Sequence, residues 1–306
     1  MKPCTKRKLF SRRFSAKSAR GHSCENAALT LDFLNHPSVF ETLRVYDGRI
    51  FQEEQHRVRL SESCAALGRE LPLGRKALKL WFRASIRKSG ISNALLRLSV
   101  HWRRNDEGEL VLSVREFQSH PSAWYEKGVT LRTAVGRRPT LKAQDPQIKA
   151  SQYVCGVLAM LDHVGATGCV DPAPAHELLF LGSLGTLAEG TVSNIFIVNP
   201  VPAWRCGRSG RRGNEAEEKS LLTPSVGSGI LKGVTREFVM DLARKRGYAV
   251  EECLLTRHEV YKAEECFITN TSSEVLPVVC VDERVIANGC PGLVTQRLAE
   301  DFKKNR

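Results

Sequence analysis

The sequence predicts an α/β protein in which a small N-terminal α+β domain precedes a larger C-terminal α/β domain. The first ~125 residues contain mostly alternating apolar and polar runs, which are typical of strands, and one strong helical pattern. After a linker rich in proline and arginine, short apolar runs alternate with helical patterns to the end of the chain. The predicted parts are a basic, disordered tail over 1–25, a first domain over 26–130 and a second domain over 131–306.

The first domain is expected to begin with a β-hairpin. FETLRVYDGRIF alternates as two strands, and Asp47-Gly48 is a favoured two-residue turn between them. HRVRLSESCAALG then has apolar residues at helical spacing, with Gly68 placed to end the helix. LLRLSV and ELVLSV predict two more strands on either side of a polar turn over 104–108.

The second domain is expected to alternate helices and strands. SQYVCGVLAMLDHV has one apolar helical face, and TREFVMDLARKRG predicts a helix that begins near Thr235 and ends at Gly247. ELLFL, NIFIV, ECFIT and VLPVVCV predict short buried strands. Residues 204–220 are charged, rich in glycine and almost without apolar side chains, so we expect a surface insertion there.

The formal net charge of +13 is concentrated at the N-terminus. Eight basic residues precede the first acidic residue, Glu25, which leaves about +5 for the remaining chain, where acidic and basic residues are mixed. This distribution argues against nucleic-acid binding as the main function. The tail has the composition of a transit peptide, although a disordered tail would look the same, and we expect a cytoplasmic protein.

The remaining composition is that of an ordinary globular protein, with 42% hydrophobic and 26% charged residues. We expect no membrane-spanning segment, because no apolar run approaches the ~20 residues that a span needs. The ten cysteines include no C-x-x-C pair, so we expect reduced, buried thiols and no metal site.

Several segments far apart in the sequence carry groups that together can bind pyridoxal phosphate (PLP). Lys149, at the start of a predicted helix, has an amine that can attack an aldehyde, and Glu189 has a carboxylate that can face a protonated ring nitrogen. GILKGVTR supplies a glycine and a helix start, whose backbone N–H groups can bind phosphate. Each residue alone would be an ordinary surface side chain.

These segments resemble the class IV aminotransferase family, which comprises the fold-type IV PLP enzymes. The matching segments, which lie within roughly residues 29–303, are FETLRVYDG with HRVRL, IKASQY, EGTVSNIF, GILKGVTR and TNTSSEVLPV. The family includes branched-chain and D-amino-acid aminotransferases and aminodeoxychorismate lyase. The resemblance implies a homodimer with PLP between the two domains of each subunit.

The resemblance also implies a role for each matching residue. Lys149 would hold PLP as a Schiff base and then move the proton at the substrate Cα, and Glu189 would face the pyridine nitrogen. Tyr153 would bind the ring hydroxyl, and Leu231 would pack on the ring face. The residues expected around the phosphate are Arg59, Val234, Thr235, Asn270 and Thr271. Those expected around the substrate are Phe40, Ser272 and Ser273.

The chain departs from the family pattern in three places. No glycine-rich turn precedes Phe40, where LTLDFLNHPSVFET stands instead, and the N-terminal strand of the family is not evident. Where many relatives have an arginine for a carboxylate, near residue 102, this chain has Trp102 followed by Arg103 and Arg104. The rim of the substrate pocket is therefore altered.

Two reactions within the family fit the sequence. The TNTSSEVLPV loop resembles the aminotransferase version, in which consecutive amides after Thr271 bind the substrate carboxylate, so we favour amino transfer between an amino acid and a 2-oxo acid. Thr42 keeps the lyase open, because its hydroxyl could help to protonate the enamine carbon released from aminodeoxychorismate, giving 4-aminobenzoate and pyruvate. A third alternative is an inactive family member that binds RNA or a membrane surface through its basic tail.

Overall fold

Two compact units make up the chain in the computed structural model. The first consists of residues 1–119 and 148–153, and the second of residues 120–147 and 154–306. The described residues are 9–15, 38–102, 107–138, 145–150, 156, 159, 175–200 and 219–306. The short segment that carries Lys149 was expected in the second domain, but it belongs to the first unit because it is bonded there to the strand that contains Phe40.

The first unit contains a five-stranded sheet in the order β1-β5-β4-β2-β3, with antiparallel pairs throughout. Its strands are β1 (Leu9–Ser15), β2 (Ser38–Tyr46), β3 (Arg49–Ile50), β4 (Ala94–Trp102) and β5 (Gly108–Glu116). The predicted hairpin is confirmed, and its turn residues Asp47 and Gly48 both have positive φ, as the favoured two-residue turn requires. The strand β1 lies within the segment that was expected to be a disordered tail.

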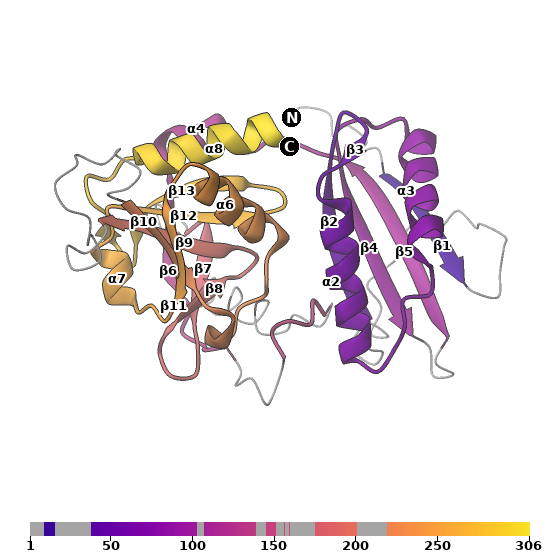
Figure 1. The fold of residues 1–306 in the computed structure, drawn as a ribbon, viewed down its shortest axis with the longest axis horizontal. Coiled ribbons are helices and arrows are strands. Elements are labelled where there is room, and N and C mark those ends of the chain that lie inside the picture. Colours follow the sequence, from indigo (N-terminus) through magenta and orange to yellow (C-terminus); the bar gives the residue numbers. More distant parts are fainter. Residues whose placement is uncertain are drawn as a thin grey trace, which may run out of the picture. The chain divides into compact units, whose positions relative to one another are not determined.

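Two helices, α2 (Glu53–Ala66) and α3 (Arg75–Ser89), pack on one face of this sheet and are drawn beside it in Figure 1. Leu60 of α2 and Phe82 of α3 contact a core that includes Leu43, Leu96 and Leu112 of the sheet, all at most 2% exposed. Because side chains alternate along a strand, Leu43 faces this core, whereas Phe40 and Thr42 lie on the opposite face of β2.

The second unit contains a nine-stranded mixed sheet in the order β11-β10-β9-β12-β13-β6-β7-β8, with β14 paired to β13. Three neighbouring pairs, β10/β11, β13/β6 and β6/β7, are parallel. The strands are β6 (Val129–Thr133), β7 (Glu177–Leu181), β8 (Leu187–Gly190), β9 (Asn194–Pro200), β10 (Lys219–Pro224), β11 (Ala249–Cys253), β12 (Glu265–Asn270), β13 (Glu274–Val281) and β14 (Arg284–Val285). The predicted α/β class is confirmed.

The helical elements of the second unit are α4 (Ser122–Lys127), η1 (Val226–Ser228), α6 (Val234–Lys245), α7 (Arg257–Tyr261) and α8 (Leu293–Asn305). Helix α6 confirms the prediction near Thr235, and the rings of Phe238 on α6 and Phe302 on α8 pack edge to face at 5.3 Å, where Figure 1 shows the two helices together. In the described part of the chain no helix is long and apolar enough to span a membrane.

Some predicted features lie outside the described residues. Of the helix expected from residue 151, only Gly156 and Ala159 are described, both as helical, so Tyr153 and Cys155 are not placed. The expected insertion is likewise outside, apart from its last two residues, which begin β10. The described cysteines are free thiols, and burial raises the pKa of Cys64 to about 12.

Candidate functional site

Lys149 is held against β2 and α2 of the first unit by its backbone. Its N–H donates to Ser63 Oγ at 3.2 Å, and its C=O accepts a hydrogen bond from the Phe40 N–H at 3.0 Å. The Lys149 Nζ lies 5.0 Å from the centroid of the Phe40 ring, on which the Arg97 guanidinium also stacks at 3.8 Å. The structure therefore brings together Lys149 and Phe40, two of the predicted site residues.

Thr42 lies on the same face of β2 as Phe40, directly opposite Arg97 of β4 in the strand register. Both Phe40 and Thr42 are partly buried, as expected for side chains on the sheet face that the helices do not cover. The predicted substrate residue Phe40 and the predicted catalytic residue Thr42 thus share one face with Arg97, which sequence analysis did not single out.

Arg59 of α2 is joined to a buried carboxylate that the sequence analysis missed. Its Nε and Nη2 donate to the two oxygens of Glu41, each at 2.7 Å, and His56 Nδ1 lies 2.7 Å from Glu41 Oε2. Glu41 is 1% exposed and occupies a core position of β2, so it needs these partners. A charged residue at a core position of an alternating strand was the available signal.

The pKa values of this cluster reflect burial and pairing. Burial acts to raise the pKa of Glu41, but the charges and hydrogen bonds of Arg59 and His56 outweigh it and lower the pKa to about 2. The pKa of His56 is lowered, chiefly by burial and also by the positive charges of Arg59 and Lys149, against the attraction of Glu41. An ionised Glu41 therefore fixes the plane of the Arg59 guanidinium.

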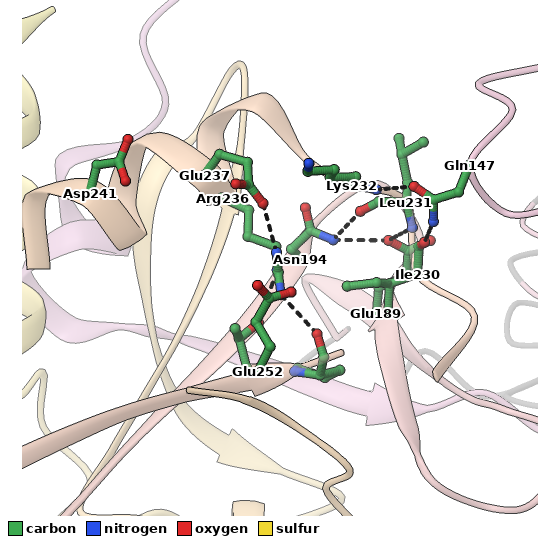
Figure 2. Close-up of polar contacts among 12 residues, drawn as sticks. Gln147, Glu189, Asn194, Ile230, Leu231, Lys232, Arg236, Glu237, Asp241 and Glu252 are labelled. Atoms are coloured by element: carbon green, nitrogen blue, oxygen red, sulfur yellow. Dashed lines mark hydrogen bonds and ion pairs between the residues drawn. The ribbon is translucent and has the colours of Figure 1, made fainter. Parts of the chain in front are cut away.

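Glu189, at the end of β8 in the second unit, is 5% exposed and accepts hydrogen bonds from three residues. Its Oε1 accepts from Arg138 Nη2, and its Oε2 accepts from Asn194 Nδ2 and from the Leu231 N–H, each at 3.0 Å. Figure 2 shows the carboxylate facing Asn194 and the backbone of Leu231. The predicted residues Glu189 and Leu231 are therefore brought together, although the contact uses the Leu231 backbone.

The segment after η1 is tied to this carboxylate by further bonds. Asn194 Nδ2 also donates to the Leu231 C=O at 3.0 Å, and the Gln147 side chain bonds the Ile230 C=O and the Lys232 N–H (Figure 2). Arg138, Asn194 and Gln147 were missed by sequence analysis, because their role depends on partners from other segments. Asn194 lies within EGTVSNIF, so the motif itself was its only signal.

The start of α6 lies very close to the side chain of Asn194. Gly233 is the N-cap residue, and the first bond of the helix is donated by Glu237, so the N–H groups of Val234, Thr235 and Arg236 have no acceptor within the helix. A Cβ at Gly233 would lie 1.9 Å from Asn194 Oδ1, which leaves no room for a side chain. This helix start combines N–H donors that have no acceptor within the helix with the positive end of the helix dipole, as an anion site requires.

The turn between β12 and β13 and the last residue of β12, Asn270, contain four predicted residues. Asn270 Oδ1 accepts hydrogen bonds from the Ser272 N–H, the Ser273 N–H and Ser272 Oγ, at 2.7–2.9 Å. The two amides that were expected to bind a substrate carboxylate after Thr271 therefore already donate to Asn270, and the structure differs from the prediction here. An asparagine two residues before a serine commonly closes such a turn on its own backbone.

Comparison with known proteins identifies a family that covers most of the chain. The family model described as "Amino-transferase class IV" matches residues 38–281. A Methanocaldococcus jannaschii protein, provisionally named a branched-chain-amino-acid aminotransferase, is 32% identical over 277 residues, covering 88% of this chain and 86% of that protein. The D-alanine aminotransferase of Bacillus licheniformis is 26% identical, with 85% and 84% covered.

Solved structures agree with the sequence comparison. The T.th. branched-chain amino acid aminotransferase with pyridoxamine 5'-phosphate superimposes with a TM-score of 0.79 at 26% identity, covering 96% of this chain and 93% of that chain. The same protein solved with N-(5'-phosphopyridoxyl)-L-glutamate gives a TM-score of 0.78. Both comparisons extend over nearly the whole chain.

Proposed function

Because the chain belongs to the class IV aminotransferase family, we propose that it binds PLP and transfers an amino group from a branched-chain amino acid to a 2-oxo acid. The predicted family and the predicted transaminase class are confirmed. The cofactor and the substrates belong to the proposal, which is supported by relatives named for branched-chain amino acids and by the pyridoxamine phosphate of a solved neighbour.

The environment of Glu189 is the observation that carries the proposal. A buried carboxylate oriented by Arg138, Asn194 and the Leu231 N–H is suited to bind a ring N–H, and a glycine-capped helix start that excludes a side chain is suited to a phosphate. When bound, PLP supplies an electron sink for the negative charge that develops at the substrate Cα. The residues of the second unit therefore fit this cofactor.

In the proposal each residue of the candidate site has a defined role. Lys149 binds the cofactor aldehyde through its amine and then moves the proton at the substrate Cα. Glu189 binds the ring nitrogen. Val234 and Thr235 bind phosphate through their N–H groups, and Thr271 through its hydroxyl. Arg59, oriented by Glu41, adds a cation for the phosphate.

Lys149 provides the direct test of PLP binding. Purified protein should absorb visible light, and borohydride reduction followed by peptide mass spectrometry should find a phosphopyridoxyl group on Lys149. Lys149→Arg keeps a cation and the backbone bonds but lacks a nucleophilic amine, so it should lose the covalent group and turnover by at least ~10³-fold. Modification of another lysine, or an unmodified chain after added PLP, would contradict the proposal.

The substrate is tested by supplying L-leucine, D-alanine and aminodeoxychorismate separately. The proposal predicts 2-oxo acid from L-leucine in the presence of an acceptor 2-oxo acid. Formation of an oxo acid from D-alanine alone would indicate a D-amino-acid aminotransferase. Formation of 4-aminobenzoate alone would indicate aminodeoxychorismate lyase activity. A homodimer and a cytoplasmic location remain part of the proposal, and light scattering of the purified protein measures the first.

A further inference from the structure

Glu177, the first residue of β7, is a buried carboxylate to which neither the sequence nor the proposed function assigns a role. It is 4% exposed, and its Oε1 accepts from the N–H groups of Val192 at 2.5 Å and Ser193 at 3.0 Å. Its Oε2 accepts from Ser193 Oγ at 2.6 Å. A Cβ at Gly190 would lie 2.3 Å from Glu177 Oε1, so the backbone after Glu189 closes tightly around this carboxylate.

Ser193 connects this carboxylate to the turn between β12 and β13. Asn270 Nδ2 donates to Ser193 Oγ at 2.9 Å, and Asn270 Oδ1 accepts the three donors of Ser272 and Ser273. A chain of short hydrogen bonds therefore runs from Glu177 through Ser193 and Asn270 to the backbone beside Thr271. It joins two segments that the proposed function places around the cofactor.

The direction of each hydrogen bond between Asn270 and Glu177 follows from the donors around Asn270 Oδ1. Three donors face Asn270 Oδ1, so the amide must present its NH₂ group to Ser193. Ser193 Oγ then accepts from Asn270 and must donate its own proton, and Glu177 Oε2 is the acceptor at 2.6 Å. Burial raises the pKa of Glu177 against the hydrogen bonds from Ser193 and Val192. An ionised carboxylate has acceptor sites for the Ser193 hydroxyl and the two backbone amides together.

We propose that Glu177 is a positioning residue that, through Ser193 and Asn270, sets the geometry of the 270–273 turn relative to the segment that carries Glu189. The inference rests on the proposed function for what the turn binds, whereas the hydrogen-bond chain itself does not. Its role is to hold the Thr271 hydroxyl and the neighbouring backbone in one arrangement, because a buried network with a single consistent polarity has one favoured geometry.

The isosteric variant Glu177→Gln tests the donor–acceptor direction of these hydrogen bonds. The new side-chain oxygen can still accept the two amides, but the new NH₂ group then meets Ser193 Oγ together with the Asn270 NH₂ group, and the hydroxyl proton loses its acceptor. Hydrogen exchange of the Ser272 and Ser273 amides, measured on the full chain as purified, should become at least roughly tenfold faster. The dissociation constant for added PLP should rise as well.

A second substitution should restore the series of hydrogen bonds, with the donor and acceptor of each side-chain bond exchanged. In Glu177→Gln/Asn270→Asp, the glutamine at position 177 donates to Ser193 Oγ, and the Ser193 hydroxyl donates to the carboxylate at position 270. That carboxylate also accepts the turn donors, so every group again has a partner. Exchange at Ser272 and Ser273 should return towards the original rate, although Asn270→Asp alone should accelerate it. Such non-additivity indicates direct coupling, which a general loss of stability would not produce.

Glu265→Gln is the matched control. Glu265 also accepts two backbone N–H groups and a hydroxyl, from Val294 and Thr295 at 2.7–3.0 Å, but it holds the start of α8. Exchange at Ser272 and Ser273 should not respond to this change. If Glu177→Gln does not fold, Ser193→Ala interrupts the same chain without altering any charge and should accelerate exchange at the same two amides.

Unchanged exchange in Glu177→Gln, or no restoration by Asn270→Asp, would overturn the inference. Failure of the proposed function looks different, because the original protein would then bind no PLP while the exchange rates still followed the substitutions. The two ideas are therefore tested by separate measurements on the same set of proteins.

Discussion

Glu41 is a carboxylate that folding removes almost completely from water. Its two oxygens are taken by Arg59 and His56, so the side chain is buried with one fixed cation and one neutral ring beside it. Such a pair contributes little when compared with an apolar pair, yet the loss of one partner leaves an uncompensated charge in the core. The residue therefore affects both the position of Arg59 and the response of the fold to acid.

Stability should fall in acid through Glu41. The pKa of Glu41 drops from 4.5 to about 2 on folding, so its contribution is complete above pH 4.5 and is lost as the pH falls towards 2, amounting to about 3 kcal/mol. The pKa of His56 is also lowered on folding, so protonation of its ring below pH 6.5 acts in the same direction. Urea unfolding at a series of pH values measures this dependence.

The substitution Glu41→Gln should cost about 3–5 kcal/mol at pH 7, because the Arg59 charge stays buried without its carboxylate, and should flatten the acid dependence. Glu54→Gln is the control. Glu54 is a partly exposed residue of α2 that pairs with Arg57 and Arg75 at the surface, where such pairs contribute little. Equal losses in the two variants would show that burial of Glu41 is not the cause.

At the scale of elements, Gly233 links a helix start to a strand. The N-cap of α6 lies so close to Asn194 of β9 that a methyl group does not fit, and Asn194 in turn binds Glu189. The backbone angles of Gly233 are open to any residue, so the glycine is required by close approach and not by conformation.

Gly233→Ala should therefore move Asn194 or the start of α6, lowering the affinity for PLP by at least ~10-fold and the unfolding free energy by about 1–3 kcal/mol. Gly74→Ala provides the matched control, because Gly74 is also an N-cap in extended backbone and nothing lies within 4 Å of a Cβ there. That change should cost only a few tenths of a kcal/mol and leave PLP binding intact. Spectroscopic titration with PLP and urea unfolding measure the two effects.

Elements with a strong local signal could be predicted from the sequence. The hairpin at Asp47-Gly48 and the helix beginning near Thr235 were expected where they lie, because turn and helix-end residues act locally. Helix α3 was missed although Leu78, Phe82 and Ile86 form its buried stripe, because charged residues surround them. Strand β1 was missed because LFSRRFS lies in a basic segment and lacks a regular apolar–polar alternation, and its stability depends on pairing with β5.

Only those residues of the candidate site that lie in or beside recognisable motifs could be predicted. Lys149 and Glu189 could be identified because the surrounding segments resemble a family, and Arg59 likewise. Arg138, in a linker, and Glu41, next to the expected Thr42, act through contacts with segments 18 to 51 residues away in the sequence. Such pairings depend on strand order and register, which local patterns do not encode.

At the scale of the whole molecule, the chain forms two units that are not consecutive in sequence. The segment 148–153 returns to the first unit, where Ala150 bridges Val39 of β2. A single domain boundary near residue 130, as the composition suggests, therefore places this segment in the second domain, although it belongs to the first unit. Each unit has its own core, with Leu96 among the buried residues of the first and Leu276 among those of the second.

Core substitutions should therefore act on one unit at a time. Leu96→Ala should lower the stability of the first unit by about 2–5 kcal/mol, because it leaves a cavity at a position with no exposure, and Leu276→Ala should do the same to the second. Hydrogen exchange resolved by residue should show faster exchange in β4 for the first variant and in β13 for the second. Matching acceleration in both units from either substitution would contradict this expectation.

Strand β1 also bears on how the N-terminal segment can be handled. It pairs along all seven of its residues with β5, from Leu9 opposite Arg115 to Ser15 opposite Glu109. A chain shortened past residue 15 would leave the N–H and C=O groups of β5 along this edge without their partners. Strands of other molecules could then add to that edge, so removal of the basic tail would favour aggregation rather than a simpler, more soluble protein.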